Sequence, residues 1–239
     1  MLIWQKAGLC LAVLLLGACF RQPLPDLSQL PEQPTDFPVE RYRKLAGEGW
    51  SVLQVDPSHS ELRIRVCRTG RMARLGHNHI VSASRIGGLA ARDGDTFTAD
   101  LYLAVADLEV DRDDLREAAG PDFDSDLTKQ DKTDTRANML SEKVLAASGH
   151  PFLAAELAAT ELASGRAEYP IDFRIRERHR TVNVPLKVDF GSQVEVRGRF
   201  SLAQSAFGLE PFSILGGAIG VADELEIEFE LVFVPATGG

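Results

Sequence analysis

The sequence predicts an all-β domain with one helical insertion, folded either as a closed antiparallel barrel or as a sandwich. From Trp50 onward, most apolar residues recur at every second position, which is the period of a strand that is buried on one face only. Regular helices do not separate these strands, and a parallel α/β sheet would need them as crossover connections. The two observations together favour antiparallel strands around an apolar interior.

The N-terminus has the features of an export signal. Lys6 precedes an apolar run over residues 7–16, which is too short to cross a bilayer as a helix but suits a signal peptide. Leu16-Gly17-Ala18-Cys19 follows directly and resembles the lipobox of bacterial lipoproteins, in which the cysteine thiol is lipidated. We expect a signal peptide over residues 1–18 and lipidation of Cys19. The alternative is an ordinary signal peptide with an incidental cysteine.

A lipidated Cys19 places the protein in the cell envelope, attached to a membrane by its acyl chains. Position 20 is Phe rather than Asp, and by analogy with enteric sorting this indicates the periplasmic face of the outer membrane. Residues 19–45 are rich in proline and lack periodicity, so we expect a flexible tether there. Residues 46–236 are then expected to form one domain.

The charge of the chain limits its partners. The formal net charge is −9, and loss of a signal peptide that contains Lys6 makes it more negative still. An acidic protein is not expected to bind nucleic acid, nor to bind anionic lipid by charge alone. The sequence leaves a homodimer open.

The expected strands follow in order along the domain, and each has an apolar face. These faces are Leu62, Ile64 and Val66; Leu101, Leu103 and Val105; Phe173 and Ile175; Val182, Val184, Leu186 and Val188; Val194, Val196, Phe200 and Leu202; and Leu225, Ile227, Phe229, Leu231 and Phe233. In the last run, glutamates fill the alternate positions from 224 to 230, which is typical of a half-buried strand. Gly198 interrupts the fifth run and predicts a bend or a close approach of another group.

Residues 110–147 interrupt the strand pattern. Residues 111–118 and 135–147 have helical composition, and Gly149 and Pro151 end the second segment. The acidic residues 122–134 between them are expected to form a loop. We therefore predict one helical insertion in an otherwise all-β chain.

Several short motifs resemble the YceI-like family when they are taken in order. Asp56-Pro57-Ser58-His59-Ser60 is similar to the strand-opening signature of that family. Further along, the similar segments are Thr135-Arg136-Ala137-Asn138-Met139, His150-Pro151-Phe152, Ala206-Phe207-Gly208-Leu209 and Val221-Ala222-Asp223-Glu224-Leu225-Glu226-Ile227. The resemblance spans about residues 50–234. Residues 175–180 depart from it because they lack the glycine of the usual turn, and the acidic loop looks longer than usual.

The resemblance implies a lipocalin-like closed antiparallel β-barrel of about eight strands, with a helix near one end. It also implies a non-catalytic envelope protein that binds an isoprenoid-type lipid, such as a quinone or a polyprenyl phosphate, in an apolar cavity. An eight-stranded barrel is about wide enough for one elongated ligand. The inward residues that we expect to line such a cavity are Ile64, Val66, Leu101, Leu103, Ile175, Val184, Phe200 and Phe229. The same faces would also suit a packed core, so a ligand-free structural or stress-response module stays open.

His77 and His79 form the most distinctive polar motif. Residues i and i+2 of an extended chain point the same way, so the two imidazoles are placed to serve one site. Gly76-His77-Asn78-His79 resembles a family variant with GHDH-like segments. Two ligands are too few for a closed metal site, and we expect the pair at the cavity mouth. A periplasmic metal-binding protein centred on His77 and His79 is the alternative.

Two further charged motifs have plainer explanations. Asp122, Asp124 and Asp126 imitate the start of a calcium loop, but Leu127 and Thr133 replace the glycine and the last acid of that motif. The arginines at positions 174, 176, 178 and 180 share a face if extended. They are expected either to meet a phosphate head group or to complement the glutamates at positions 224–230.

The sequence gives little sign of catalysis. It contains no Gly-x-Ser-x-Gly, P-loop or dinucleotide-binding motif. Cys67 is the single cysteine of the expected domain, and we expect it to be a small apolar residue rather than a nucleophile. We therefore expect a protein that is not an enzyme and needs no cofactor.

Overall fold

The computed structural model describes residue 24 and residues 31–236. The predicted signal peptide over residues 1–18 and the predicted lipidation site Cys19 lie outside the described residues. Among the helices of the described part, none has the length and apolar character needed to cross a membrane.

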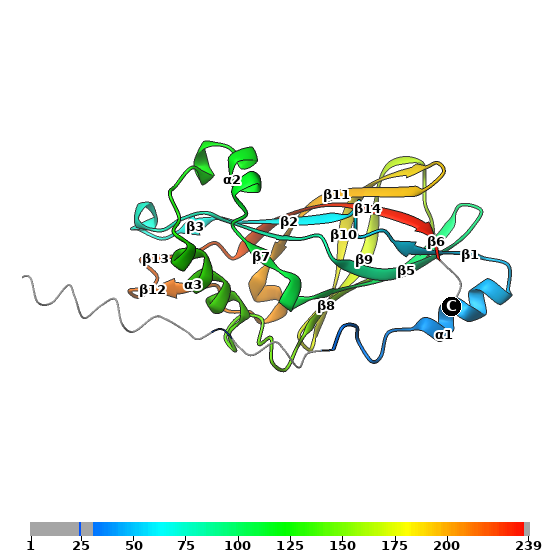
Figure 1. Ribbon diagram of the computed structural model, residues 1–239, viewed down its shortest axis with the longest axis horizontal. Coiled ribbons are helices and arrows are strands. Elements are labelled where there is room, and N and C mark those ends of the chain that lie inside the picture. The colour runs from blue at the N-terminus through cyan, green and yellow to red at the C-terminus, as the bar shows by residue number, and fades with distance from the viewer. Residues whose placement is uncertain (1–23, 25–30, 237–239) are drawn as a thin grey trace, which may run out of the picture.

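Eight antiparallel strands close into a barrel, as predicted. Their order around the ring is β1, β5, β6, β8, β9, β10, β11 and β14, and β14 pairs back to β1. The strands are β1 (Ser51–Val55), β5 (Ile86–Asp93), β6 (Thr96–Ala104), β8 (Phe152–Glu161), β9 (Gly165–Ile175), β10 (Arg178–Phe190), β11 (Val194–Ala203) and β14 (Glu224–Pro235). Figure 1 shows β14 running along the length of the molecule, with β9 and β10 crossing this direction more steeply.

The barrel wall continues beyond this closed ring on one side. Strands β2 (Glu61–Val66), β4 (His79–Ala83) and β7 (Glu109–Val110) form this extension. The final strand β14 pairs with β1 through Phe233 and with β2 through Phe229, so β1 and β2 follow one another along it. Strand β4 pairs with β2, and β7 pairs with β4. The extension therefore lengthens the barrel toward one end.

Short elements gather at this extended end. A small sheet contains β12 (Ser213–Ile214), β13 (Ile219–Val221) and β3 (Arg68–Thr69). The helices α2 (Asp113–Ala119) and α3 (Lys129–Leu140) lie here, whereas α1 (Val39–Gly47) lies at the opposite end (Figure 1). Single 3₁₀ turns are η1 (Ala73–Leu75), η2 (Val105–Asp107), η3 (Pro121–Phe123) and η4 (Gln204–Phe207).

The helical insertion differs from its predicted limits. Helix α3 begins at Lys129, six residues before the predicted start, and it ends at Leu140. Its start is fixed by a capping box, in which the Thr128 hydroxyl accepts from the Asp131 amide and the Asp131 carboxylate accepts from the Thr128 amide. The expectation of a continuous acidic loop over residues 122–134 was wrong because this Thr-x-x-Asp pattern starts a helix.

Part of the expected tether is folded against the barrel. Helix α1 covers residues 39–47, and its Tyr42 is buried with its hydroxyl donating to Asp100 Oδ2 at 2.7 Å. Arg41 contacts the same carboxylate at 2.9 Å. Upstream, the Phe37 ring packs edge-on against Tyr102 with ring centroids 5.1 Å apart. The folded part of the chain therefore begins before residue 46.

Candidate ligand cavity

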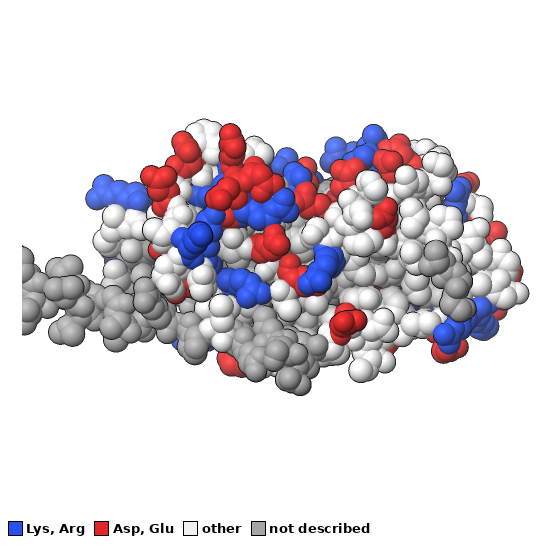
Figure 2. All heavy atoms as spheres, in the orientation of Figure 1, with Lys and Arg blue, Asp and Glu red and all other residues white. Residues whose placement is uncertain are grey.

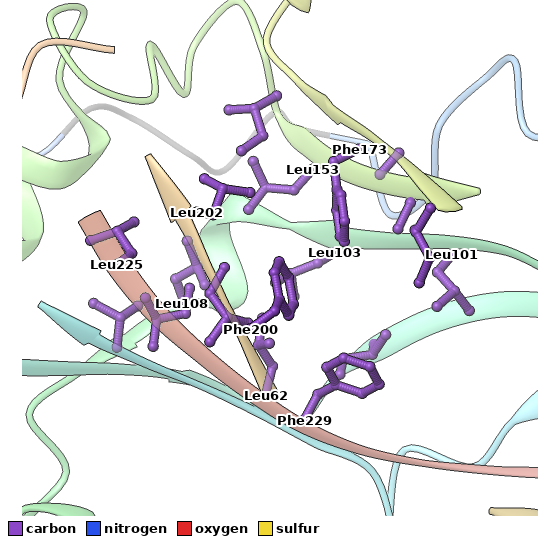
Figure 3. Close-up of a pocket in the computed structure, with 18 of the residues that line it drawn as sticks. Leu62, Leu101, Leu103, Leu108, Leu153, Phe173, Phe200, Leu202, Leu225 and Phe229 are labelled. Carbon is purple, nitrogen blue, oxygen red and sulfur yellow. The ribbon is translucent and has the colours of Figure 1, made fainter. Parts of the chain in front are cut away.

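The barrel contains a cavity of about 350 Å³, within the range of about 300–1,000 Å³ that is usual for ligand pockets. Its wall is almost entirely apolar. In Figure 3, leucine and phenylalanine side chains from β2, β6, β8, β9, β11 and β14 surround a common space. The strand alternation that is visible in the sequence supplies these inward faces.

Seven of the eight predicted lining residues do line this cavity. They are Ile64, Val66, Leu101, Leu103, Ile175, Phe200 and Phe229. Val184 is the exception, because it is fully buried in the packed cluster that also contains Leu186 and Val188. Alternation indicates which face of a strand points inward, but not whether neighbours or empty space lie beyond it. That the seven bind a ligand stays a prediction.

Three neighbouring phenylalanine rings line the cavity. Phe200 stacks on Phe173 at a centroid distance of 5.3 Å and meets Phe229 edge-on at 6.4 Å. Gly198 makes room for the last ring, since a Cβ at this position would lie 2.5 Å from Phe229 Cζ. The predicted close approach at Gly198 is therefore confirmed.

Helix α3 completes the wall at the extended end. Strand β7 has only two residues and pairs with β4, and the next strand of the ring, β8, pairs with β6 and β9. Between β7 and β8, Thr135, Asn138 and Met139 of α3 line the cavity. The sequence indicated a helix here but not its place in the cavity wall.

His79 connects the cavity to a buried polar network. It opens β4, lines the cavity, and places Nδ1 at 2.6 Å from Asp111 Oδ2. Asp111 is inaccessible to solvent and accepts from the Ile80 amide at 2.9 Å. Burial alone would raise the pKa of Asp111, but its hydrogen bonds to His79, Ile80 and Arg116 hold that pKa below its usual value. Asp111 is therefore a carboxylate.

Arg116 neutralises this carboxylate and joins it to the insertion. Its Nη1 donates to Asp111 Oδ1 at 2.8 Å and to the Asn78 carbonyl at 2.9 Å. Its Nη2 donates to the Phe123 carbonyl and to both oxygens of Ser125. One buried guanidinium thus fixes β4, α2 and the segment after η3 relative to one another.

The three aspartates that imitate the start of a calcium loop have no such buried role. The side chains at positions 122, 124 and 126 are exposed, and the Asp122 carbonyl accepts from Asn78 Nδ2 at 3.0 Å. This contact uses the backbone of the loop rather than its carboxylates. It fixes the loop beside the histidine motif.

His77 lies next to His79 but takes no part in the hydrogen bond between His79 and Asp111. The two rings are edge-on with centroids 6.4 Å apart, and His77 Nδ1 is buried without a hydrogen-bond partner. Burial lowers the pKa of His77. Among the described residues, no group of three or more His, Cys, Asp or Glu side chains is placed to hold a metal ion. The metal-binding alternative lacks a ligand set in this part of the chain.

The predicted arginine face does not form. The chain reverses between β9 and β10, with Arg176 in the turn at φ 56°, so the four arginines belong to two strands and a turn. Arg174 pairs with Asp36 at 2.8 Å. The glutamates of β14 face β2 and β11 instead, as in the pair of Arg197 and Glu230 at 2.6 Å. Figure 2 shows acidic and basic side chains intermixed across the visible face.

Cys67 lies between β2 and β3 and is half-buried. Burial, and next the charge of Glu226, raises the pKa of its thiol. A protonated thiol is a poor nucleophile, and Cys67 does not line the cavity.

Known proteins resemble this chain in both sequence and fold. The YceI-like domain family matches residues 53–233. The crystal structure of BcnA from Burkholderia cenocepacia is similar with a TM-score of 0.54 and 18% identity, covering 77% of this chain and 99% of that chain. A polyisoprenoid binding domain from Saccharophagus degradans, implicated in plant cell wall breakdown, has a TM-score of 0.52 and 9% identity, covering 78% of this chain and 99% of that chain. Curated protein sequences give no match.

Proposed function

The chain belongs to the YceI-like domain family, and we propose that it binds an apolar, isoprenoid-type lipid inside its barrel without catalysing a reaction. The apolar cavity of about 350 Å³ is the observation that carries this proposal. A structural relative is described as a polyisoprenoid binding domain, which supports the same class of ligand. A cavity of this size favours a ligand over a packed, ligand-free module.

The composition of the wall favours binding by the tail of the lipid. Each buried CH₂ group contributes about 0.8 kcal/mol, so one five-carbon isoprene unit contributes up to about 4 kcal/mol. Rings such as Phe173, Phe200 and Phe229 give this tail flat surfaces to pack against. The described lining residues include no serine, cysteine or lysine that would act as a nucleophile.

Lipid extraction tests this proposal directly. The full chain is purified from its own membranes, and organic extracts are analysed by mass spectrometry. We expect one isoprenoid-type lipid at close to one equivalent. The Ala155→Phe variant fills the cavity between Leu101 and Phe173, which lie opposite Ala155 on β6 and β9, and should lose the lipid.

Ala158→Phe is the matched control, because Ala158 lies on the same strand but is exposed. It should retain the lipid. An empty wild-type barrel, or equal lipid in the Ala155→Phe protein, would contradict the proposed function.

We propose that the mature protein is anchored through an acylated Cys19 at the periplasmic face of the outer membrane. The apolar run before Cys19 and the small residues at positions 17 and 18 support this. Cells fed a labelled fatty acid should transfer the label to the wild-type chain and not to the Cys19→Ser chain. Label on the serine variant, or a wild-type protein outside the outer-membrane fraction, would disprove the anchor or its location.

A further inference from the structure

The few polar side chains of the cavity wall are unevenly placed. They belong to His79, Tyr102, Thr135, Asn138 and Gln204. Gln204 already donates to the Ala222 carbonyl at 2.8 Å, and the Tyr102 ring packs against Phe37 and Phe152. The other three come from the start of β4 and from α3, at the extended end of the barrel. Helix α3 contacts β7, which pairs with β4, so these two elements lie close together.

The hydrogen bond to Asp111 determines which nitrogen of His79 is protonated. An ionised carboxylate only accepts hydrogen bonds, so Nδ1 carries the proton that is donated to Asp111 Oδ2 over 2.6 Å. The other ring nitrogen, Nε2, makes no hydrogen bond within the described part of the chain. Asp111 is already balanced by Arg116 at 2.8 Å, so this carboxylate does not need a second cation at His79. In a neutral ring with its proton on Nδ1, Nε2 is a hydrogen-bond acceptor without a partner.

The cavity wall also restricts the head group of a ligand. A phosphate would need a cation, but no lysine or arginine is among the described residues that line the cavity. A quinone carbonyl only accepts hydrogen bonds and finds no donor at Nε2. A hydroxyl group donates and fits this nitrogen.

We propose that His79 is the head-group site of the cavity, and that its Nε2 accepts a hydrogen bond from a hydroxyl of an amphipathic isoprenoid. The hydroxyl head, of a prenyl alcohol or a reduced quinone, lies at the α3 end, and the tail extends along the barrel. Thr135 and Asn138 lie at the same end and offer further polar groups to the head. This inference rests on the proposed lipid-binding function, and it narrows the ligand class.

The described residues include two other histidine–aspartate pairs of similar geometry, which serve as controls. His59 Nδ1 lies 2.7 Å from Asp56, and His179 Nδ1 lies 2.9 Å from Asp172. The side chains of His59 and His179 are 69% and 58% exposed, against 14% for His79. Only His79 among these three also lines the cavity. Its position, rather than the pairing alone, defines the site.

Two probes with the same tail test the site. The delipidated full chain is titrated with farnesol and with farnesyl methyl ether, which lacks the hydroxyl proton. We expect the wild type to bind the alcohol about tenfold more tightly, or ~1.4 kcal/mol. In the His79→Asn variant, the amide nitrogen replaces Nδ1 beside Asp111 and no atom replaces Nε2. This variant should bind both probes with the affinity of the wild type for the ether, whereas His179→Asn should retain the tenfold preference.

The outcomes separate the two proposals. Equal binding of both probes by the wild type, or an unchanged preference in His79→Asn, would overturn the head-group site and leave lipid binding intact. Binding of neither probe would overturn both proposals. A second measurement on the ¹⁵N-labelled wild type avoids reliance on the variant: the Nε2 signal of His79 should shift with the alcohol and not with the ether. An Nε2 signal that farnesol leaves unmoved would also refute the site.

Discussion

Arg116→Ala is predicted to be among the most destabilising single changes in the described domain. Arg116 is only 6% exposed and hydrogen-bonds to Asn78, Asp111, Phe123 and Ser125. Its removal leaves the buried carboxylate of Asp111 without its cation, a defect that costs about 3–5 kcal/mol. A domain of this length changes its unfolding temperature by about 2–4 °C per kcal/mol, so the expected decrease is about 6–20 °C.

Circular dichroism measures both losses, the free energy of unfolding in a urea titration and the unfolding temperature in a thermal scan. Arg112→Ala is the matched control on the residue that directly precedes α2, because Arg112 is 37% exposed and pairs with the exposed Asp114 at 2.6 Å. A surface pair of this kind contributes about 0–1 kcal/mol. If Arg116→Ala costs no more than Arg112→Ala, the buried network does not hold the insertion in place, and the fixed geometry inferred for Asp111 and His79 is wrong.

Four further changes test other parts of the structure. Thr128→Ala removes the cap of α3 and should lower the unfolding free energy in urea by about 0.5–2 kcal/mol; no change would discount the capping box. Tyr42→Ala should cost about 3–5 kcal/mol and expose α1 to limited proteolysis, and resistance equal to wild type would argue against its docking on the barrel. Gly198→Ala forces the Phe229 ring into the cavity, which should cost about 1–3 kcal/mol and weaken farnesol binding in the same titration; unchanged affinity would contradict the crowding. The folded-state pKa of Asp111 is lowered, so its stabilisation is present above the unfolded pKa of about 3.9 and is lost as pH falls through the folded value. Asp111→Asn should therefore reduce the acid dependence of urea unfolding, and an unchanged pH profile would exclude this contribution.

The barrel was predictable because each of its strands has a local, periodic alternation of apolar and polar residues. Runs such as residues 225–233 alternate without interruption, and a half-buried strand imposes that alternation directly. The same pattern identified seven cavity-lining residues. It misplaced Val184 because period two reports the face of a strand, whereas a cavity depends on the sizes of side chains that arrive from distant strands. Val184 meets Tyr169 across the β9–β10 pair, and that register is not visible in either segment alone.

Two helices were missed or misplaced although the sequence contains weak signals for both. Thr128 and Asp131 have the spacing of a capping box, but the surrounding acidic residues resemble a solvated loop. In α1, Val39, Tyr42 and Leu45 recur at helical spacing within a proline-rich segment. Their common face becomes significant only because Asp100 on a distant strand accepts from Tyr42.

The hydrogen-bond partners of the two histidines could not be predicted from the sequence. The pair of His77 and His79 suggested one shared site, yet in the structure the two rings have different environments. His79 is held by Asp111, 32 positions away, while His77 is buried beside it without a partner at Nδ1. Such a partner is a property of the tertiary fold, since the insertion that contains Asp111 must first fold back onto β4.

The position of this polar network follows from the architecture of the barrel. Inside the closed ring, neighbouring strands satisfy the backbone groups and apolar side chains cover the inward face, so a buried carboxylate would lack donors there. At the extended end, the two-residue strand β7 is followed by helices. Their geometry brings the Arg116 guanidinium and free backbone groups to Asp111. A lipid that enters such a barrel finds apolar contacts along most of its length and a fixed polar atom at one end only. The helical insertion therefore makes one end of the cavity different from the other. Whether a bound lipid places its head group at that end is tested by the preference of His79 for a hydroxyl.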